Sequence, residues 1–330
     1  MSIDKEYILD EIKDKYIINE SSKFYRIYKV FDKPCNNSFH DRNVSCCPDS
    51  TNLGKISSKV TKILKDVYSN LYRIYDTTVG TNNTYFDDVK NKDYILCYTS
   101  LKCWLYDKII INELNVTEIN EIFTGWENYI KDELKNTPSN SCVFNELTLD
   151  EIKRLKNIYA LYTVLYDNNA NFETCKGNKC KYLEYVGKGL DEMISSINSC
   201  SNNSNDTNYC NEFKEFVDLC KEDNAYAGIS IYLENTKSKA IDEGKYLLSI
   251  QMYKNKPHYI YIKNEELLNY VKTSDFLSNK TTTIAATSVV GSAIGLSSIF
   301  YYFYKVIHNN IFKYKCCTTI NIKYVDKILL

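Results

Sequence analysis

Apolar residues recur at helical spacing along most of the chain before position 222. Between positions 56 and 75, steps of three and four residues place the apolar side chains on one face of an amphipathic helix. That face consists of Ile56, Val60, Ile63, Leu64, Val67, Leu71, Ile74 and Tyr75. A shorter pattern of Ile8, Ile12 and Tyr16 predicts a helix near the N-terminus. The patterning indicates a mainly α-helical fold.

Four further helices are predicted. The stretch 94–110 is apolar nearly all round, so we expect a central, buried helix. The TLDE pattern at 148–151 is a capping box that opens a helix reaching to about Tyr166. Two more helices are expected at 180–198 and 209–221.

Strand and loop signals are fewer. The run HYIYI at 258–262, after a proline, is the one segment that resembles a strand. Polar and turn-forming residues predict loops at 33–52, 136–141 and 199–209.

The last two predicted helices allow a specific pairing of cysteines. If they pack as an antiparallel hairpin, Cys180 faces Cys220 at one end and Cys200 faces Cys210 at the other. Both pairs would then meet the Cα separation that a disulfide requires. We therefore predict two bridges, each worth about 2–4 kcal/mol.

Cysteine usage also indicates the compartment. Eleven of the thirteen cysteines precede position 284, a density that suggests disulfides and an oxidising environment. Cys97 and Cys103 lie on different faces of one predicted helix, so they are either buried filler or bridged to partners elsewhere. The chain has no CxxC motif, and none of its three histidines stands at ligand spacing from a cysteine pair. We expect no metal and no cofactor.

A long uncharged run lies near the C-terminus. Lys280 and Lys305 bracket 24 positions without a charge, and Ile284–Tyr304 forms its apolar part. A helix of that length covers roughly 36 Å, enough to cross a hydrocarbon core of about 30 Å. Tyr301, Tyr302 and Tyr304 gather at one end, where aromatic rings favour the headgroup boundary. We predict a transmembrane helix, with a buried helix of a soluble core as the alternative.

This span defines the expected domain organisation. Residues 1–275 would form a helical, cysteine-rich ectodomain, 276–283 a juxtamembrane linker, 284–304 the transmembrane helix and 305–330 a short cytoplasmic tail. The expected fold class is a mainly α, multi-helix, disulfide-bonded ectodomain followed by one C-terminal transmembrane helix.

Two motifs accompany the span. Gly291 and Gly295 form a GxxxG step that would permit weak self-association of two helices. Cys316 and Cys317 lie among lysines just beyond the span, so they are candidates for S-acylation, or else two free thiols in a short tail.

The N-terminal twenty residues are charged throughout and lack the apolar core of a signal peptide. Two topologies are therefore open. Either the protein is tail-anchored with its large domain in the cytosol, or the span itself directs translocation of that domain. The lysines that flank the span are nearly balanced and only slightly favour a cytosolic tail.

Charge and motifs exclude several functions. The net charge is −1 and only four of the 41 basic residues are arginines, which argues against nucleic-acid binding. The chain has no GxSxG, HExxH or Walker sequence, and the glycines of VGKGL at 186–190 lie within a predicted helix. We do not expect an enzyme.

Several ordered segments resemble one known family. They are LCYTSLKCWLYDKI at 96–109, CKYLEYVGKGLDEM at 180–193, CNEFKEFVDLC at 210–220 and FYKVIHNNIFKYK at 303–315, at the end of the span. With the lone C-terminal span, they are similar to the Plasmodium interspersed repeat (PIR) proteins, and to the vir branch of Plasmodium vivax in particular. The tail departs from the family, since members often end in a longer basic run whereas this chain stops at VDKILL.

The resemblance implies a variant antigen of a malaria parasite, exported to the infected red-cell membrane with its N-terminal domain outside. Such a protein would bind host cell-surface receptors or antibodies and serve adhesion and immune evasion. The alternative is a tail-anchored intracellular scaffold that remodels parasite or host-cell membranes, placed on internal parasite or vesicle membranes.

Overall fold

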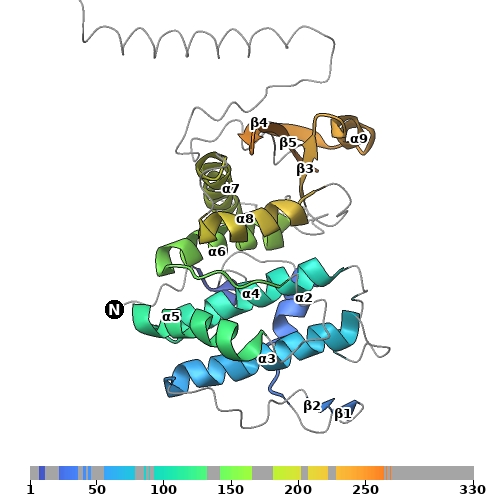
Figure 1. Cartoon of the computed structure of the whole chain (residues 1–330). Coiled ribbons are helices and arrows are strands. Elements are labelled where there is room, and N and C mark those ends of the chain that lie inside the picture. The colour runs from blue at the N-terminus through green and yellow to red at the C-terminus, as the bar shows by residue number, and fades with distance from the viewer. Residues whose placement is uncertain are drawn as a thin grey trace, which may run out of the picture. The chain divides into compact units, whose positions relative to one another are not determined.

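The structure, a computed structural model, describes part of the chain. The described residues are 7–11, 22–35, 40–41, 44–45, 56–78, 85–86, 89, 93–131, 142–165, 181–201, 207–221, 228–263, 265 and 268. The chain divides into two units, Met1–Thr282 and Thr283–Leu330, and every described residue belongs to the first unit. This described part is mainly helical, as predicted (Figure 1).

Several predictions concern residues outside the described ranges. They are the linker 276–283, the span 284–304 and the tail 305–330, together with Gly291, Gly295, Cys316 and Cys317. Across the residues that the structure does describe, no helix is both long enough and apolar enough to cross a bilayer.

The two helices with the clearest patterns are present. Helix α3 (Ser58–Thr78) buries Val60 and Leu64 on its predicted apolar face. Helix α4 (Tyr94–Ile111) is buried on nearly all sides, which confirms the central helix predicted at 94–110. At the N-terminus, the short stretch 9–11 is the described part of the helix that was predicted there.

The later helices also form where the pattern placed them. Helix α6 (Leu149–Leu165) opens with the predicted capping box: the backbone N–H of Thr148 donates to Glu151 Oε2 at 2.8 Å, and the N–H of Glu151 donates to Thr148 Oγ1 at 3.3 Å. Helices α7 (Lys181–Ser199) and α8 (Asn208–Leu219) follow.

The packing of α7 on α6 explains why a glycine stands at position 189, the second glycine of the VGKGL segment. Gly189 lies where α7 packs on α6, and a Cβ at this position would stand 2.9 Å from the carbonyl oxygen of Asn157. Glycine therefore permits a close approach of the two helices that a larger residue would prevent.

Several helices had not been predicted. They are α2 (Lys23–Val30), α5 (Val116–Gly125) with its continuing π-turn η3 (Trp126–Ile130), and the short α9 (Lys237–Asp242). The start of helix α5 could have been predicted from the sequence, because Asn115 and Glu118 form a complete capping box there.

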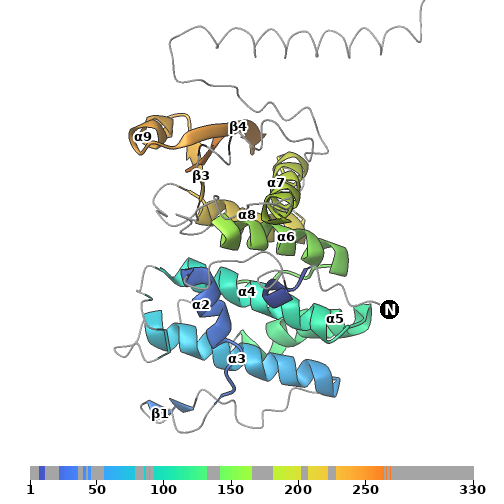
Figure 2. The same ribbon diagram turned by 180° about the vertical axis from the view of Figure 1, so that it is seen from behind.

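Helix α4 is the centre of the helical packing. Helices α2 and α3 contact it, and α6 and α8 contact it as well (Figures 1 and 2). Aromatic contacts join α4 to its neighbours. The ring of Trp104 meets that of Phe31, just after α2, edge to face with centroids 6.4 Å apart, and the ring of Tyr106 stacks on that of Tyr159 of α6 with centroids 6.2 Å apart.

A three-stranded antiparallel sheet follows the helices. The strands β3 (Ile229–Leu233), β4 (Tyr246–Tyr253) and β5 (Lys256–Ile262) pair in the order β3–β5–β4. Only β5 was predicted, at 258–262. Two very short strands, β1 (His40–Asp41) and β2 (Val44–Ser45), pair within the segment predicted as a loop.

Candidate functional site

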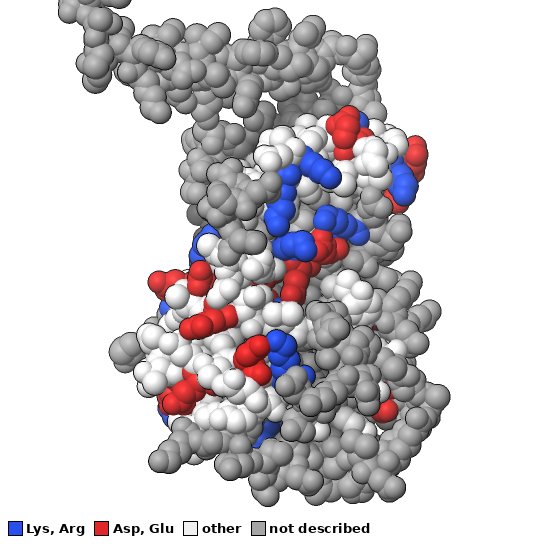
Figure 3. Space-filling view, viewed as in Figure 1, with Lys and Arg blue, Asp and Glu red and all other residues white. Residues whose placement is uncertain are grey.

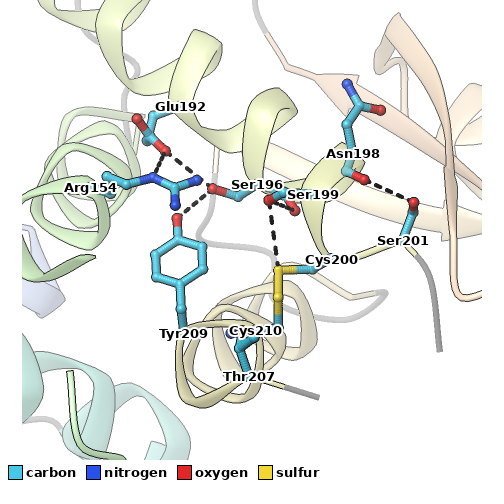
Figure 4. Close-up of a disulfide and its surroundings, with 10 residues drawn as sticks. All are labelled: Arg154, Glu192, Ser196, Asn198, Ser199, Cys200, Ser201, Thr207, Tyr209 and Cys210. Carbon is cyan, nitrogen blue, oxygen red and sulfur yellow. Dashed lines mark hydrogen bonds and ion pairs between the residues drawn. A yellow bond between two sulfur atoms is a disulfide. The ribbon is translucent and has the colours of Figure 1, made fainter. Parts of the chain in front are cut away.

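One predicted disulfide links α7 to α8. Cys200 follows the end of α7 and Cys210 lies in the first turn of α8, with their Cα atoms 5.5 Å apart (Figure 4). The bridge joins cysteines that lie ten positions apart in the sequence, and both are buried. Thr207 caps α8 next to the bridge, accepting from the backbone N–H of Cys210 at 3.2 Å.

Polar side chains from three helices meet beside this disulfide. The Nε of Arg154 on α6 lies 2.6 Å from Glu192 Oε1 on α7, and its guanidinium lies 4.1 Å from the ring centre of Tyr209 on α8 (Figure 4). The hydroxyls of Tyr209 and Ser196 are 2.5 Å apart. Burial raises the pKa of Tyr209 to about 12, so its phenol stays protonated. We call these four residues with the disulfide the disulfide corner.

The second predicted bridge is absent. Cys220 is a buried free thiol, so it does not pair with Cys180, which lies outside the described residues. The prediction assumed that α7 and α8 run side by side as an antiparallel hairpin. Instead α7 packs against α6 and β4 and crosses α8 (Figures 1 and 2). The carbonyl of Cys220 accepts from the backbone N–H of Ile231 at 2.9 Å, which directs the chain into the sheet.

The remaining described cysteines divide into two groups. Cys35 is disulfide-bonded. Cys97, Cys103 and Cys142 are free and buried, and burial raises the pKa of each thiol, to about 12 for Cys103 and higher for the other two. A thiol must ionise to act as a nucleophile, so these three are unreactive packing groups at neutral pH.

A buried ionic triad joins α4 to α8. The Nζ of Lys102 lies 2.6 Å from Glu212 Oε2 and 2.6 Å from Glu215 Oε2. Lys102 and Glu212 are fully buried, and Glu212 Oε1 also accepts from the backbone N–H of Asn145 at 2.8 Å. Burial alone would lower the pKa of Lys102, but the two carboxylates outweigh it and the pKa is raised. Burial raises the pKa of Glu215 to about 7.

A second buried ion pair joins α4 to α6. The Nζ of Lys156 lies 2.7 Å from Asp107 Oδ1, and both side chains are fully buried. Lys156 also contacts the sulfur of Cys103 at 2.9 Å. Asp107 Oδ2 accepts from the hydroxyl of Tyr28 at 2.7 Å and from the backbone N–H of Leu9 at 3.2 Å. This group ties the N-terminal segment and α2 to the central helix.

The sequence revealed one member of each buried ion pair but not its partner. Lys102 and Asp107 stand inside the apolar run 94–110, and a buried charge requires a partner. Their partners are Glu212 and Lys156, which lie 110 and 49 positions away, too distant for spacing rules to connect. The described residues hold no group of three or more side chains arranged to bind a metal ion.

No protein-family model, curated protein or solved structure matches the chain. The similarity to the PIR family therefore rests on the sequence segments alone and remains a prediction.

Proposed function

We propose that the chain is a single-pass surface protein of the PIR type, a variant antigen whose N-terminal domain faces the outside of the infected red cell. The observation that carries this proposal is the uncharged run Ile284–Tyr304, which follows a folded domain containing the Cys200–Cys210 disulfide. The disulfide supports an oxidising compartment.

The described chemistry supports recognition rather than catalysis. The free thiols of Cys97, Cys103 and Cys142 are held protonated, and the buried carboxylates of Glu212 and Asp107 are engaged by lysines. Such a core makes a rigid scaffold, on which the exposed loops would carry the variable contacts with receptors or antibodies.

Protease accessibility on intact infected cells tests this proposal. A full-length chain with an epitope tag at each end should lose the N-terminal tag on trypsin treatment and keep the C-terminal tag. Permeabilised cells are the control, in which both tags should be lost. An N-terminal tag that survives on intact cells and disappears after permeabilisation would contradict surface display.

The buried free thiols favour a second function, an intracellular tail-anchored scaffold. Four described cysteines, including Cys220, are unbridged, as expected in a reducing compartment. Burial also explains them, because a buried thiol whose pKa is raised is inert and serves as a packing group. Mass spectrometry without reductant separates the two proposals: the scaffold should carry Cys200 and Cys210 as thiols, and the surface antigen should carry them as a disulfide.

A further inference from the structure

Basic side chains gather where α8 lies against the sheet (Figure 3). Lys214 belongs to α8 and Lys221 follows its end, with side chains 52% and 38% exposed. Lys254 lies in the turn between β4 and β5, and Lys256, which is exposed, begins β5. We call these four lysines the basic face.

His258 connects the two parts of the basic face. It stands two positions after Lys256 on β5, so both side chains lie on the same face of the sheet. Burial lowers the pKa of His258, and the ammonium groups of Lys221 and Lys256 lower it further. A lysine at the end of α8 and a lysine of the sheet therefore act on the same imidazole ring. The two parts form one positively charged surface.

A single carboxylate of α8 pairs with these lysines. Asp218 lies 2.5 Å from the Nζ of Lys221 and 4.0 Å from that of Lys214. The other two acidic residues of α8 are engaged by Lys102 in the buried triad. Within the part of the chain that the structure describes, the two lysines of the hairpin form no ion pair. The basic face therefore keeps an excess of positive charge that is free to bind an anion.

The hairpin of β4 and β5 is fixed beside α8. The backbone N–H of Lys254 donates to the carbonyl oxygen of Ser201 at 3.0 Å, one residue after the disulfide cysteine Cys200. The ring of Tyr253 meets that of Phe213 on α8, with centroids 6.3 Å apart. Because the backbone that carries the lysines is already in place, a ligand would bind without the cost of ordering it.

The backbone of the turn favours a residue other than lysine. Lys254 and Asn255 both have positive φ, 46° and 60°, in a two-residue hairpin turn. Asparagine and glycine adopt this conformation readily, whereas lysine does so at some cost in local stability. A lysine at the first position of the turn is explained if its side chain serves binding rather than folding.

The composition of the basic face indicates the class of partner. Interfaces between proteins are usually centred on apolar and aromatic side chains and are poor in lysine. Here the exposed apolar side chains of β4, Ile250 and Met252, lie on the opposite face of the sheet from Lys256. Lysine binds anionic groups as a point charge, without the planar pairing of arginine. Such a surface suits a polymer that carries many anionic groups.

We propose that the basic face binds a sulfated polysaccharide of the host cell surface, with sulfate groups on Lys221, Lys254 and Lys256. The inference rests on the proposed function and deepens it by naming the class of receptor. A domain that faces the outside of the cell meets polysaccharides, whereas nucleic acids lie inside cells. Attraction between the lysines and the sulfates would also concentrate the polymer at this surface.

Heparin, a highly sulfated polysaccharide, is the probe that tests this inference. The full chain in non-ionic detergent is passed over immobilised heparin, and we expect binding that weakens as salt rises. Lys254→Asn/Lys256→Gln should weaken binding about tenfold. Asparagine suits the backbone of the turn, so the hairpin should remain folded in this variant. Lys237→Gln/Lys239→Gln, on α9, removes the same charge elsewhere and is the matched control, which should bind as the parent does.

The outcomes separate the basic face from general attraction between charges. A parent chain that does not bind heparin overturns the inference, and so does an equal loss of binding in the control variant. Polyglutamate that binds as tightly as heparin overturns the polysaccharide and would assign the basic face to acidic peptides. Heparin binding is measured on the purified chain, so it does not depend on topology. Protection of the N-terminal tag on intact cells would contradict surface display without changing the heparin result.

Discussion

Charged residues occupy opposite environments in the helices around α4 and in the C-terminal sheet. Around α4, Lys102, Lys156 and Asp107 are fully buried and paired across helices. In the sheet region, the pair Lys237–Glu234 lies at the surface, with side chains 39% and 58% exposed. Ion pairs of the same residue types should therefore contribute differently to the free energy of unfolding in the two regions.

Solvation explains this difference. A charge taken out of water loses its hydration and depends on its partner, so removal of the partner leaves an uncompensated buried charge. An exposed pair is solvated whether or not its partner is present, and its contribution is typically below about 1 kcal/mol. The buried pairs therefore hold helices together, whereas the surface pair contributes little to the stability of the sheet.

The largest expected effect comes from breaking the buried Lys156–Asp107 ion pair between α4 and α6. Lys156→Met keeps most of the volume but leaves the Asp107 carboxylate buried without a counter-charge. We expect the free energy of unfolding to fall by about 3–5 kcal/mol. Urea unfolding of the detergent-solubilised chain, followed by far-ultraviolet circular dichroism, measures the loss.

The double variant Lys156→Met/Asp107→Leu is the control. It removes both charges, so it should recover much of the stability lost in the single variant. A double variant as unstable as Lys156→Met would show that packing, rather than the orphaned charge, accounts for the loss.

The next largest effect concerns the disulfide corner. Cys200→Ala/Cys210→Ala removes the cross-link between α7 and α8 and should lower the free energy of unfolding by about 2–4 kcal/mol. The same urea titration measures it. Cys220→Ala is the matched control, because it removes a buried thiol without opening a bridge. An equal loss in the control would contradict a stabilising role for the bridge.

The two regions also differed in how far the sequence predicted them. Helices α3 and α4 were predicted from the spacing of their apolar residues. Helix α3 buries one apolar face, and α4 is buried nearly all round. Strand β4 did not, since Ser249 and Gln251 point inward while Ile250 and Met252 point outward. The usual alternation, which identifies half-buried strands, is inverted there.

Distance along the chain limited the prediction of the site. Cys200 and Cys210 lie only ten positions apart, so the short connection between their helices was enough to predict the bridge. The Cys180–Cys220 bridge required the two antiparallel helices to stay side by side over their whole length, whereas α7 packs against α6 and β4 instead. The partner of Lys102, 110 positions away, depends on the packing of α8 on α4.

The triad of Lys102, Glu212 and Glu215 predicts a smaller effect that depends on pH. The pKa of Glu215 is raised from 4.5 to about 7, so the folded state binds a proton more tightly than the unfolded state does. The stability that this proton contributes is fully present below about pH 4.5. It is lost as the pH rises through about 7.

Glu215→Gln isolates this contribution, because glutamine mimics the protonated carboxyl at every pH. The parent chain should lose stability relative to Glu215→Gln between about pH 5 and 8, as measured by urea midpoints across that range. Glu118→Gln, at the exposed capping box of α5, is the control. A difference between parent and Glu215→Gln that stays constant with pH would refute the raised pKa.

The smallest effect is expected where the comparison began, at the surface of the sheet. Lys237→Ala removes the ion pair with Glu234 and the contact of its ammonium with the ring of Tyr259, 4.8 Å from the ring centre. Because water replaces the lost partner, the free energy of unfolding should change by no more than about 1 kcal/mol. A shift of the urea midpoint as large as that of Lys156→Met would mean that the surface pair stabilises the sheet as strongly as a buried one. The contrast between the two regions would then reflect location in the fold rather than solvation.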